Sequence, residues 1–217
     1  MHRQARSLRL ALAAGAALAL ALGVAAAAIV SGPSGHDSSS SRPSSTVVAA
    51  GAASAFAGAA LPANIIAPPF TLSDQEGRRV SLSQYRGHVL VLTFLYSTCG
   101  APCVLIAQQI RGALDELRAR VPVLIVSADP AADSPARVRR FLSEAALSGR
   151  AQYLSGPPAL LRQVWAAYHV KPASAGSRVF DEYASVLLID PSGRERVVFE
   201  SEQLTPESLS HDIQKLD

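Results

Sequence analysis

The stretch "HVLVLTFLYSTCGAPCVLIAQQI", residues 88 to 110, holds both cysteines of the chain, Cys99 and Cys103. Its first part, residues 88–96, is a continuous run of aliphatic, β-branched and aromatic side chains, which is typical of a strand buried on both faces. Apolar residues then recur at helical spacing, so we expect a helix from about residue 102 to 120. Cys99 therefore follows the carboxyl end of a buried strand, where open α/β sheets place their sites. Cys103 falls in the first turn of the helix.

The spacing of the two cysteines favours reactive or metal-binding thiols over a stabilising disulfide. A bridge across three intervening residues constrains the unfolded chain less than one that closes a long loop. The first-turn amides and the positive end of the helix dipole favour a thiolate at this place. Two roles remain open, exchange with a disulfide of another protein and binding of Cu(I), which prefers thiolate ligands. A closed structural zinc site has four ligands, and the chain has no further cysteine, so zinc binding is less favoured.

The elements around this stretch alternate between strand and helix. A turn signal at residues 74–77 separates two β-like runs and predicts a hairpin, and a second buried strand is expected over residues 121–129. A short strand is expected at residues 152–154, and a second hairpin around the turn at residues 191–193.

Three further helices are expected to begin at prolines, since proline is favoured in the first turn; these are Pro135, Pro158 and Pro206. Trp165 and Tyr168, at helical spacing, are expected in the core. The order of elements predicts an α/β domain over residues 65–217, with a thioredoxin-like fold and an added N-terminal β-hairpin.

Residues 1–30 have the pattern of a signal or membrane anchor. Three arginines precede an uncharged apolar run, residues 10–30, which is long enough to cross a bilayer as a helix. Positive charge before the run sends the rest of the chain across the membrane. We favour a retained membrane helix, because a signal core has only about 7 to 15 residues. The domain is then extracytoplasmic and tethered, or secreted or periplasmic if the segment is cleaved.

Residues 31–64 are rich in Ser, Ala, Gly and Pro and are predicted to form a disordered linker, because they offer little apolar surface to bury. The formal net charge of +3 equals the charge of Arg3, Arg6 and Arg9, which leaves the rest of the chain neutral. No basic stripe with interleaved aromatic residues follows, so we exclude nucleic-acid binding.

The motifs around the cysteines resemble the Sco/SenC family, thioredoxin-like copper proteins that are tethered to membranes and involved in assembling cytochrome c oxidase. The resemblance covers about residue 68 to the C-terminus, in "PPFTLSDQEGRRVSLSQYRGHVLVLTFLYSTC", "LIVSADPAADSPARVRRFL" and "LLIDPSGRERVVF". The three-residue gap between Cys99 and Cys103 is the spacing of this family, whereas thioredoxins have two. The resemblance implies that Cys99 and Cys103 are the two copper-binding thiols. Three positions beside them, Gly100, Ala101 and Val104, depart from the family's Pro and Asp after the first cysteine and Pro after the second.

The third copper ligand of the family is a histidine eight residues before the aspartate that corresponds to Asp190. Glu182 occupies that place here, and a carboxylate is a hard ligand that suits Cu(I) poorly. His169 is the histidine whose loop could fold towards the cysteines, although a lone histidine at a helix end is more often a polar cap.

The sequence thus predicts a membrane-tethered, extracytoplasmic Sco-like protein. It would deliver copper to the copper site of cytochrome c oxidase, or reduce the oxidised cysteines of that site to thiols, with an oxidase subunit or another thiol or copper protein as partner. The alternative is a general thiol–disulfide oxidoreductase of the same fold without copper. A binding domain that keeps the fold without thiol chemistry is a third interpretation.

Overall fold

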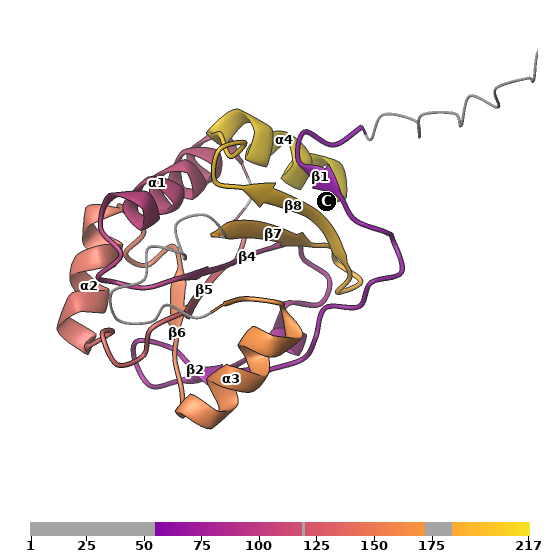
Figure 1. The fold of residues 1–217 in the computed structure, drawn as a ribbon. Helices are drawn as coiled ribbons and strands as arrows, with labels where there is room; N and C mark the ends of the chain where they lie inside the picture. The colour runs from indigo at the N-terminus through magenta and orange to yellow at the C-terminus, as the bar shows by residue number, and fades with distance from the viewer. Residues whose placement is uncertain (1–54, 119, 172–183) are drawn as a thin grey trace, which may run out of the picture. The chain divides into compact units, whose positions relative to one another are not determined.

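The computed structural model describes residues 55–118, 120–171 and 184–217, and its main feature is a six-stranded mixed sheet (Figure 1). The strands lie in the order β1 (Ala59–Ala60), β8 (Glu195–Glu200), β7 (Ser185–Ile189), β4 (Leu90–Leu95), β5 (Val123–Ser127) and β6 (Gln152–Leu154). β4, β5 and β6 are parallel to one another, and the remaining pairs are antiparallel. Two parallel crossovers followed by an antiparallel hairpin are the thioredoxin-like arrangement that the order of elements predicted.

The four helices are α1 (Ala101–Glu116), α2 (Pro135–Glu144), α3 (Pro158–Ala167) and α4 (Pro206–Leu216). Each has proline in its first two positions, where the missing N–H costs nothing. The side chains of Ser134 and Thr205 cap α2 and α4 by accepting backbone N–H groups of the first turn. Figure 1 shows α1, α2 and α4 on one face of the sheet and α3 on the other.

The central strand β4 is buried along its whole length, as its apolar run predicted. It pairs with β5 through Val91↔Val123 to Leu95↔Ser127 and with β7 through Leu90↔Ile189 to Thr93↔Val186. Because strands on both sides satisfy its backbone and helices cover both faces, apolar residues are favoured at every position. The cysteine loop therefore follows a strand that is buried along its whole length.

The predicted N-terminal hairpin consists of β2 (Thr71–Ser73) and β3 (Arg79–Ser81), followed by a 3₁₀ helix, η1 (Leu82–Tyr85). The buried carboxylate of Asp74 organises its turn, since it accepts hydrogen bonds from the backbone N–H groups of Glu76 and Arg78. α3 is tied to the chain that leads into this hairpin, because Tyr168 donates its hydroxyl to Pro68 O and packs edge-on against Phe70.

Of the two predicted core residues, Trp165 is confirmed, whereas Tyr168 follows the last residue of α3 and is only partly buried against the core. Trp165 is buried and donates Nε1–H to Ser127 O at 3.0 Å. α3 ends at Ala167, because His169 adopts a left-handed conformation with φ 55°. Val170 N then donates to Trp165 O, which closes the helix end.

Two boundaries differ from the sequence prediction. α1 ends at Glu116 rather than near residue 120, because Leu117 is extended and leads the chain back towards β5. Residues 55–64, which the sequence assigned to the linker, contain β1, and β1 pairs with β8. The amides of Ala57 and Gly58 donate to the fully buried carboxylate of Asp212 on α4. These hydrogen bonds offset the conformational entropy that the segment loses on folding, which its small side chains cannot offset by burial.

The predicted membrane helix lies outside the described residues, as does Glu182. Within the part of the chain that the structure describes, no helix is long and apolar enough to span a bilayer.

Candidate thiol site

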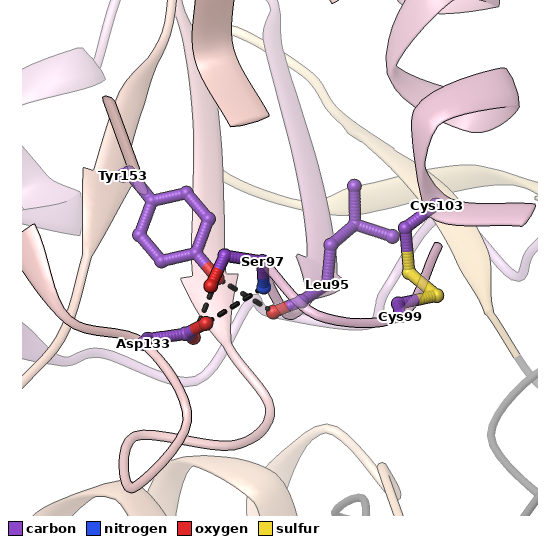
Figure 2. The surroundings of a disulfide bond; sticks show 6 residues. All are labelled: Leu95, Ser97, Cys99, Cys103, Asp133 and Tyr153. Carbon is purple, nitrogen blue, oxygen red and sulfur yellow. Dashed lines mark hydrogen bonds between the residues drawn. A yellow bond between two sulfur atoms is a disulfide. The ribbon is translucent and has the colours of Figure 1, made fainter. Parts of the chain in front are cut away.

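Cys99 and Cys103 form a disulfide bond in the loop between β4 and α1, with their Cα atoms 5.7 Å apart (Figure 2). Cys99 lies four residues after the end of β4, and Cys103 is the third residue of α1. The tight loop between them depends on Gly100, whose φ of 82° and ψ of −147° are open essentially only to glycine. The prediction that these two thiols meet at the carboxyl end of a buried strand agrees with this geometry.

The two sulfurs have different surroundings. Cys103 is completely buried and belongs to the hydrophobic core, whereas Cys99 is partly exposed at its edge. A partner's sulfur can reach Cys99 without rearrangement of the helix, but it cannot reach Cys103 while Cys99 is in place. Cys99 is therefore the more accessible of the two cysteines to the sulfur of another protein.

The start of α1 favours a thiolate on electrostatic grounds. Its first turn contains no acidic side chain, and Pro102 removes one N–H without disturbing the helix. The remaining first-turn amides and the helix dipole point towards the cysteine loop and lower the energy of a negative sulfur.

Asp133, in the loop between β5 and α2, is the residue at this site that the sequence analysis missed. Figure 2 shows its carboxylate pointing towards Ser97 and the hydroxyl of Tyr153. Its Oδ1 accepts the N–H of Ser97 at 2.6 Å, and its Oδ2 accepts the hydroxyls of Ser127 and Tyr153, each at 2.6 Å. The side chain of the neighbouring Asp129 accepts a hydrogen bond from Ala132 N in the same loop. The one local signal for Asp133 in the sequence is its place directly before Ser134, the N-cap residue of α2.

His169 lies at the end of α3, beside a cavity of about 220 Å³ that is also lined by Phe94, Tyr168 and Glu195. Burial raises the pKa of Glu195, and the nearby His169 opposes that shift. Neither cysteine lines this cavity. Glu182, the position of the family's histidine, is outside the described residues, so its relation to the sulfurs stays a prediction.

Metal-binding groups do not gather elsewhere in the described ranges. Among residues 55–118, 120–171 and 184–217, no group of three or more His, Cys, Asp or Glu side chains is placed to hold a metal ion. A larger cleft of about 850 Å³, lined by Arg78, Arg118, Arg120 and Arg150 among others, opens near the first residues of β5 and β6. The cysteine loop follows the opposite end of the neighbouring parallel strand β4, so the cleft has no part in the thiol site.

The sequence profile of the SCO1/SenC family matches residues 58–216, which include β1, the cysteine loop and α4. The chain belongs to this family. The match begins inside the segment that was predicted to be linker, in agreement with the pairing of β1 with β8.

Two curated relatives of this SCO1/SenC protein each match over 90 residues. A SCO1 protein homolog of Bacillus subtilis is 29% identical over 40% of this chain and 47% of its own length. Peroxiredoxin Bcp of Escherichia coli is 37% identical over 41% of this chain and 54% of its own length. The chain thus spans about half the length of the curated relatives that it matches.

Solved structures share the thioredoxin-like fold. BsSco, a member of the Sco family of cytochrome c oxidase assembly proteins in which a disulfide switch was identified, superimposes with a TM-score of 0.63 at 22% identity, over 72% of this chain and 95% of that chain. Copper-bound ScoI of Bradyrhizobium japonicum superimposes with a TM-score of 0.56 at 28% identity, over 70% of this chain and 99% of that chain. The thioredoxin domain of a thiol-disulfide oxidoreductase from Bacteroides vulgatus superimposes with a TM-score of 0.56 at 16% identity, over 72% of this chain and 99% of that chain.

Proposed function

We propose that this SCO1/SenC protein acts in the assembly of cytochrome c oxidase, through thiol exchange and Cu(I) transfer by Cys99 and Cys103. The observation that carries the proposal is the Cys99–Cys103 disulfide, with one sulfur accessible and the other buried at a helix start. Family membership and the likeness to copper-bound ScoI and to BsSco supply the biological setting.

As a reductant, the site would use the two cysteines in sequence. The Cys99 thiolate attacks one sulfur of a partner disulfide, and the other partner sulfur leaves as a thiolate. The Cys103 thiolate then attacks Cys99 Sγ, which forms the internal disulfide and releases the second partner sulfur. Two electrons pass from this protein to the partner, and the partner's two copper-binding cysteines become free thiols.

As a carrier, the reduced pair would hold Cu(I) as cargo. Two thiolates suit this soft ion, so the donor set fits as far as the described residues go. The resemblance to the family implies a third ligand from the segment around Glu182, and a carboxylate there predicts weaker binding than a histidine. His169 is the alternative third ligand.

Competition of the reduced protein with a Cu(I) chelator tests the carrier function. We expect one equivalent of copper, lost in Cys99→Ser and in Cys103→Ser and bound more tightly in Glu182→His. If the wild type binds tightly, Glu182→His gains nothing and His169→Ala abolishes binding, His169 is the third ligand. If no variant binds while the protein still reduces protein disulfides, the carrier function is wrong and the general oxidoreductase stands.

The proposed function also requires that the domain lie on the extracytoplasmic side of the membrane. We propose that residues 1–30 anchor the protein and that the domain lies on the extracytoplasmic side, where the arginines before the apolar run would place it. Reporter fusions after residue 64 test this, and activity of a reporter that works only in the cytoplasm would contradict it.

A further inference from the structure

The carboxylate of Asp133 joins the ends of three neighbouring parallel strands. Ser97 follows β4, Ser127 is the last residue of β5 and Tyr153 lies within β6, and each donates one hydrogen bond to Asp133 at 2.6 Å. β4, β5 and β6 are adjacent in the sheet, so the carboxylate closes the edge from which the cysteine loop emerges.

We propose that Asp133 is a positioning residue of the thiol site, which holds the start of the cysteine loop so that Cys99 closes on Cys103. The inference rests on the proposed thiol chemistry of these two residues. It adds a residue outside the disulfide that sets how readily the disulfide forms.

The contacts of the loop explain why one carboxylate has this effect. Cys103 is held by α1 and by the core that surrounds it, so its position does not depend on the loop. Cys99 lies two residues after Ser97, and its own N–H is bonded within the loop, to Tyr96 O at 3.2 Å. The Ser97–Asp133 bond is therefore a hydrogen bond that ties this half of the loop to the neighbouring strands.

The partners of Asp133 are themselves fixed. Ser127 and Tyr153 are almost completely buried, and Tyr153 OH also lies 3.2 Å from Leu95 O, at the end of β4. Burial, and then the charge of Asp133, raise the pKa of Tyr153 well above its ordinary value, so its hydroxyl stays protonated and donates. Hydrogen bonds to an ionised acceptor are about twice as strong as neutral ones, which makes this an effective clamp.

The direction of the effect follows from the state in which the clamp is seen. The three hydrogen bonds are present with the disulfide closed, and we infer that they hold the closed loop more firmly than the loop of the reduced protein, so their loss raises the free energy of the oxidised protein more than that of the reduced one. A released loop also spreads Cys99 over more positions, which lowers its effective concentration at Cys103. Both effects make the disulfide easier to reduce.

Equilibration of the full chain with reduced and oxidised glutathione measures this directly, since two electrons pass from the dithiol to glutathione disulfide. For Asp133→Ala we expect a loss of about tenfold or more in the equilibrium constant for disulfide formation, equivalent to a potential about 30 mV higher. Asp133→Asn is expected to recover most of it, because its Oδ1 still accepts from Ser97 and its amide can donate to the two hydroxyl oxygens.

Two matched controls separate positioning from general destabilisation. Asp212→Ala removes another carboxylate that ties down a chain segment, and the amides that it binds, those of Ala57 and Gly58, lie outside the cysteine loop, so we expect lower stability with an unchanged potential. Ser97→Ala keeps the N–H that binds Asp133 and should also leave the potential unchanged.

An unchanged potential in a folded Asp133→Ala protein would overturn the proposal, as would an equal shift in Asp212→Ala. If Asp133→Ala does not fold, Tyr153→Phe, which removes one donor to the carboxylate, should raise the potential by a smaller amount, and no change there would also overturn it. The measurement needs neither copper nor the oxidase, so a failed copper titration would not affect its outcome.

Discussion

Cys99 and Cys103 share one disulfide bond, yet Cys103 is fully buried in the core while Cys99 remains partly exposed. This asymmetry predicts the order in which the reduced thiols react. Under limiting iodoacetamide, Cys99 should be alkylated at least about ten times faster than Cys103, because reactivity requires an accessible thiolate. Peptide mass spectrometry resolves the two sites, and the fully unfolded protein, in which both should react alike, is the control. Faster labelling of Cys103 would contradict the assignment of roles.

Replacing both cysteines by alanine should leave the fold intact. The loop that the disulfide closes is short, so the chain-entropy model predicts a loss of only about 2 kcal/mol in the free energy of unfolding. Urea unfolding of the double variant and of the oxidised wild type measures the difference, while disulfide exchange should be absent. A variant that no longer folds would show that the bond serves mainly as a structural staple.

Gly100→Ala tests the strained turn between the cysteines. No heavy atom beyond the two adjacent residues lies within 4 Å of the position that a Cβ would occupy, so the cost comes from the backbone, at φ 82°. We expect a loss of about 1–3 kcal/mol in unfolding free energy, the range for a residue held in such a conformation. Ala101→Gly, at the exposed first position of α1, is the control and should change stability much less. Equal stability of Gly100→Ala and wild type would mean that the loop adopts another conformation.

A protein that begins at residue 65, where the sequence alone placed the domain start, should be less stable than one that begins at residue 55. The shorter protein lacks β1 and leaves the buried carboxylate of Asp212 without the amides of Ala57 and Gly58. His211 Nδ1 still lies 2.8 Å from Asp212 Oδ1, but a buried acceptor that loses partners costs about 1–3 kcal/mol, and more when it is charged. Thermal unfolding of both proteins measures this loss. If their stabilities are the same, residues 55–64 behave as linker.

Asp190, in the turn between β7 and β8, should make stability depend on pH in acid. Burial raises the pKa of its carboxyl, but hydrogen bonds from Ser192, from Arg194 N and from Arg196 outweigh burial and leave the pKa below its ordinary value. A depressed folded pKa contributes stability that is present above the unfolded value, near pH 4, and is lost as the pH falls through the folded value.

Unfolding by urea at a series of pH values below about 4 measures that loss. Asp190→Asn should be less stable at neutral pH and should lose less stability on acidification than the wild type. Part of the acid dependence should remain, because the pKa of Asp74 is also lowered. Identical acid profiles for Asp190→Asn and the wild type would exclude this contribution.

Local patterns were sufficient to predict the elements that carry the site. The apolar run of β4, the proline that opens each helix and the turn residues of both hairpins act over a few residues, so the sequence alone places Cys99 and Cys103 at a strand end and a helix start. The family's motifs are local too, and the profile match agrees with them.

The tertiary structure decided which carboxylates hold the site and where the domain begins. Asp133 binds residues 36, 6 and 20 positions away, and Asp212 binds the amides of Ala57 and Gly58, about 155 positions away. In the sequence both aspartates are ordinary polar residues near helices, because nothing in their neighbourhood reveals a distant donor. A small-residue segment such as 55–64 has little tendency to order by itself, and it becomes part of the domain because a strand edge and a buried carboxylate supply its hydrogen bonds.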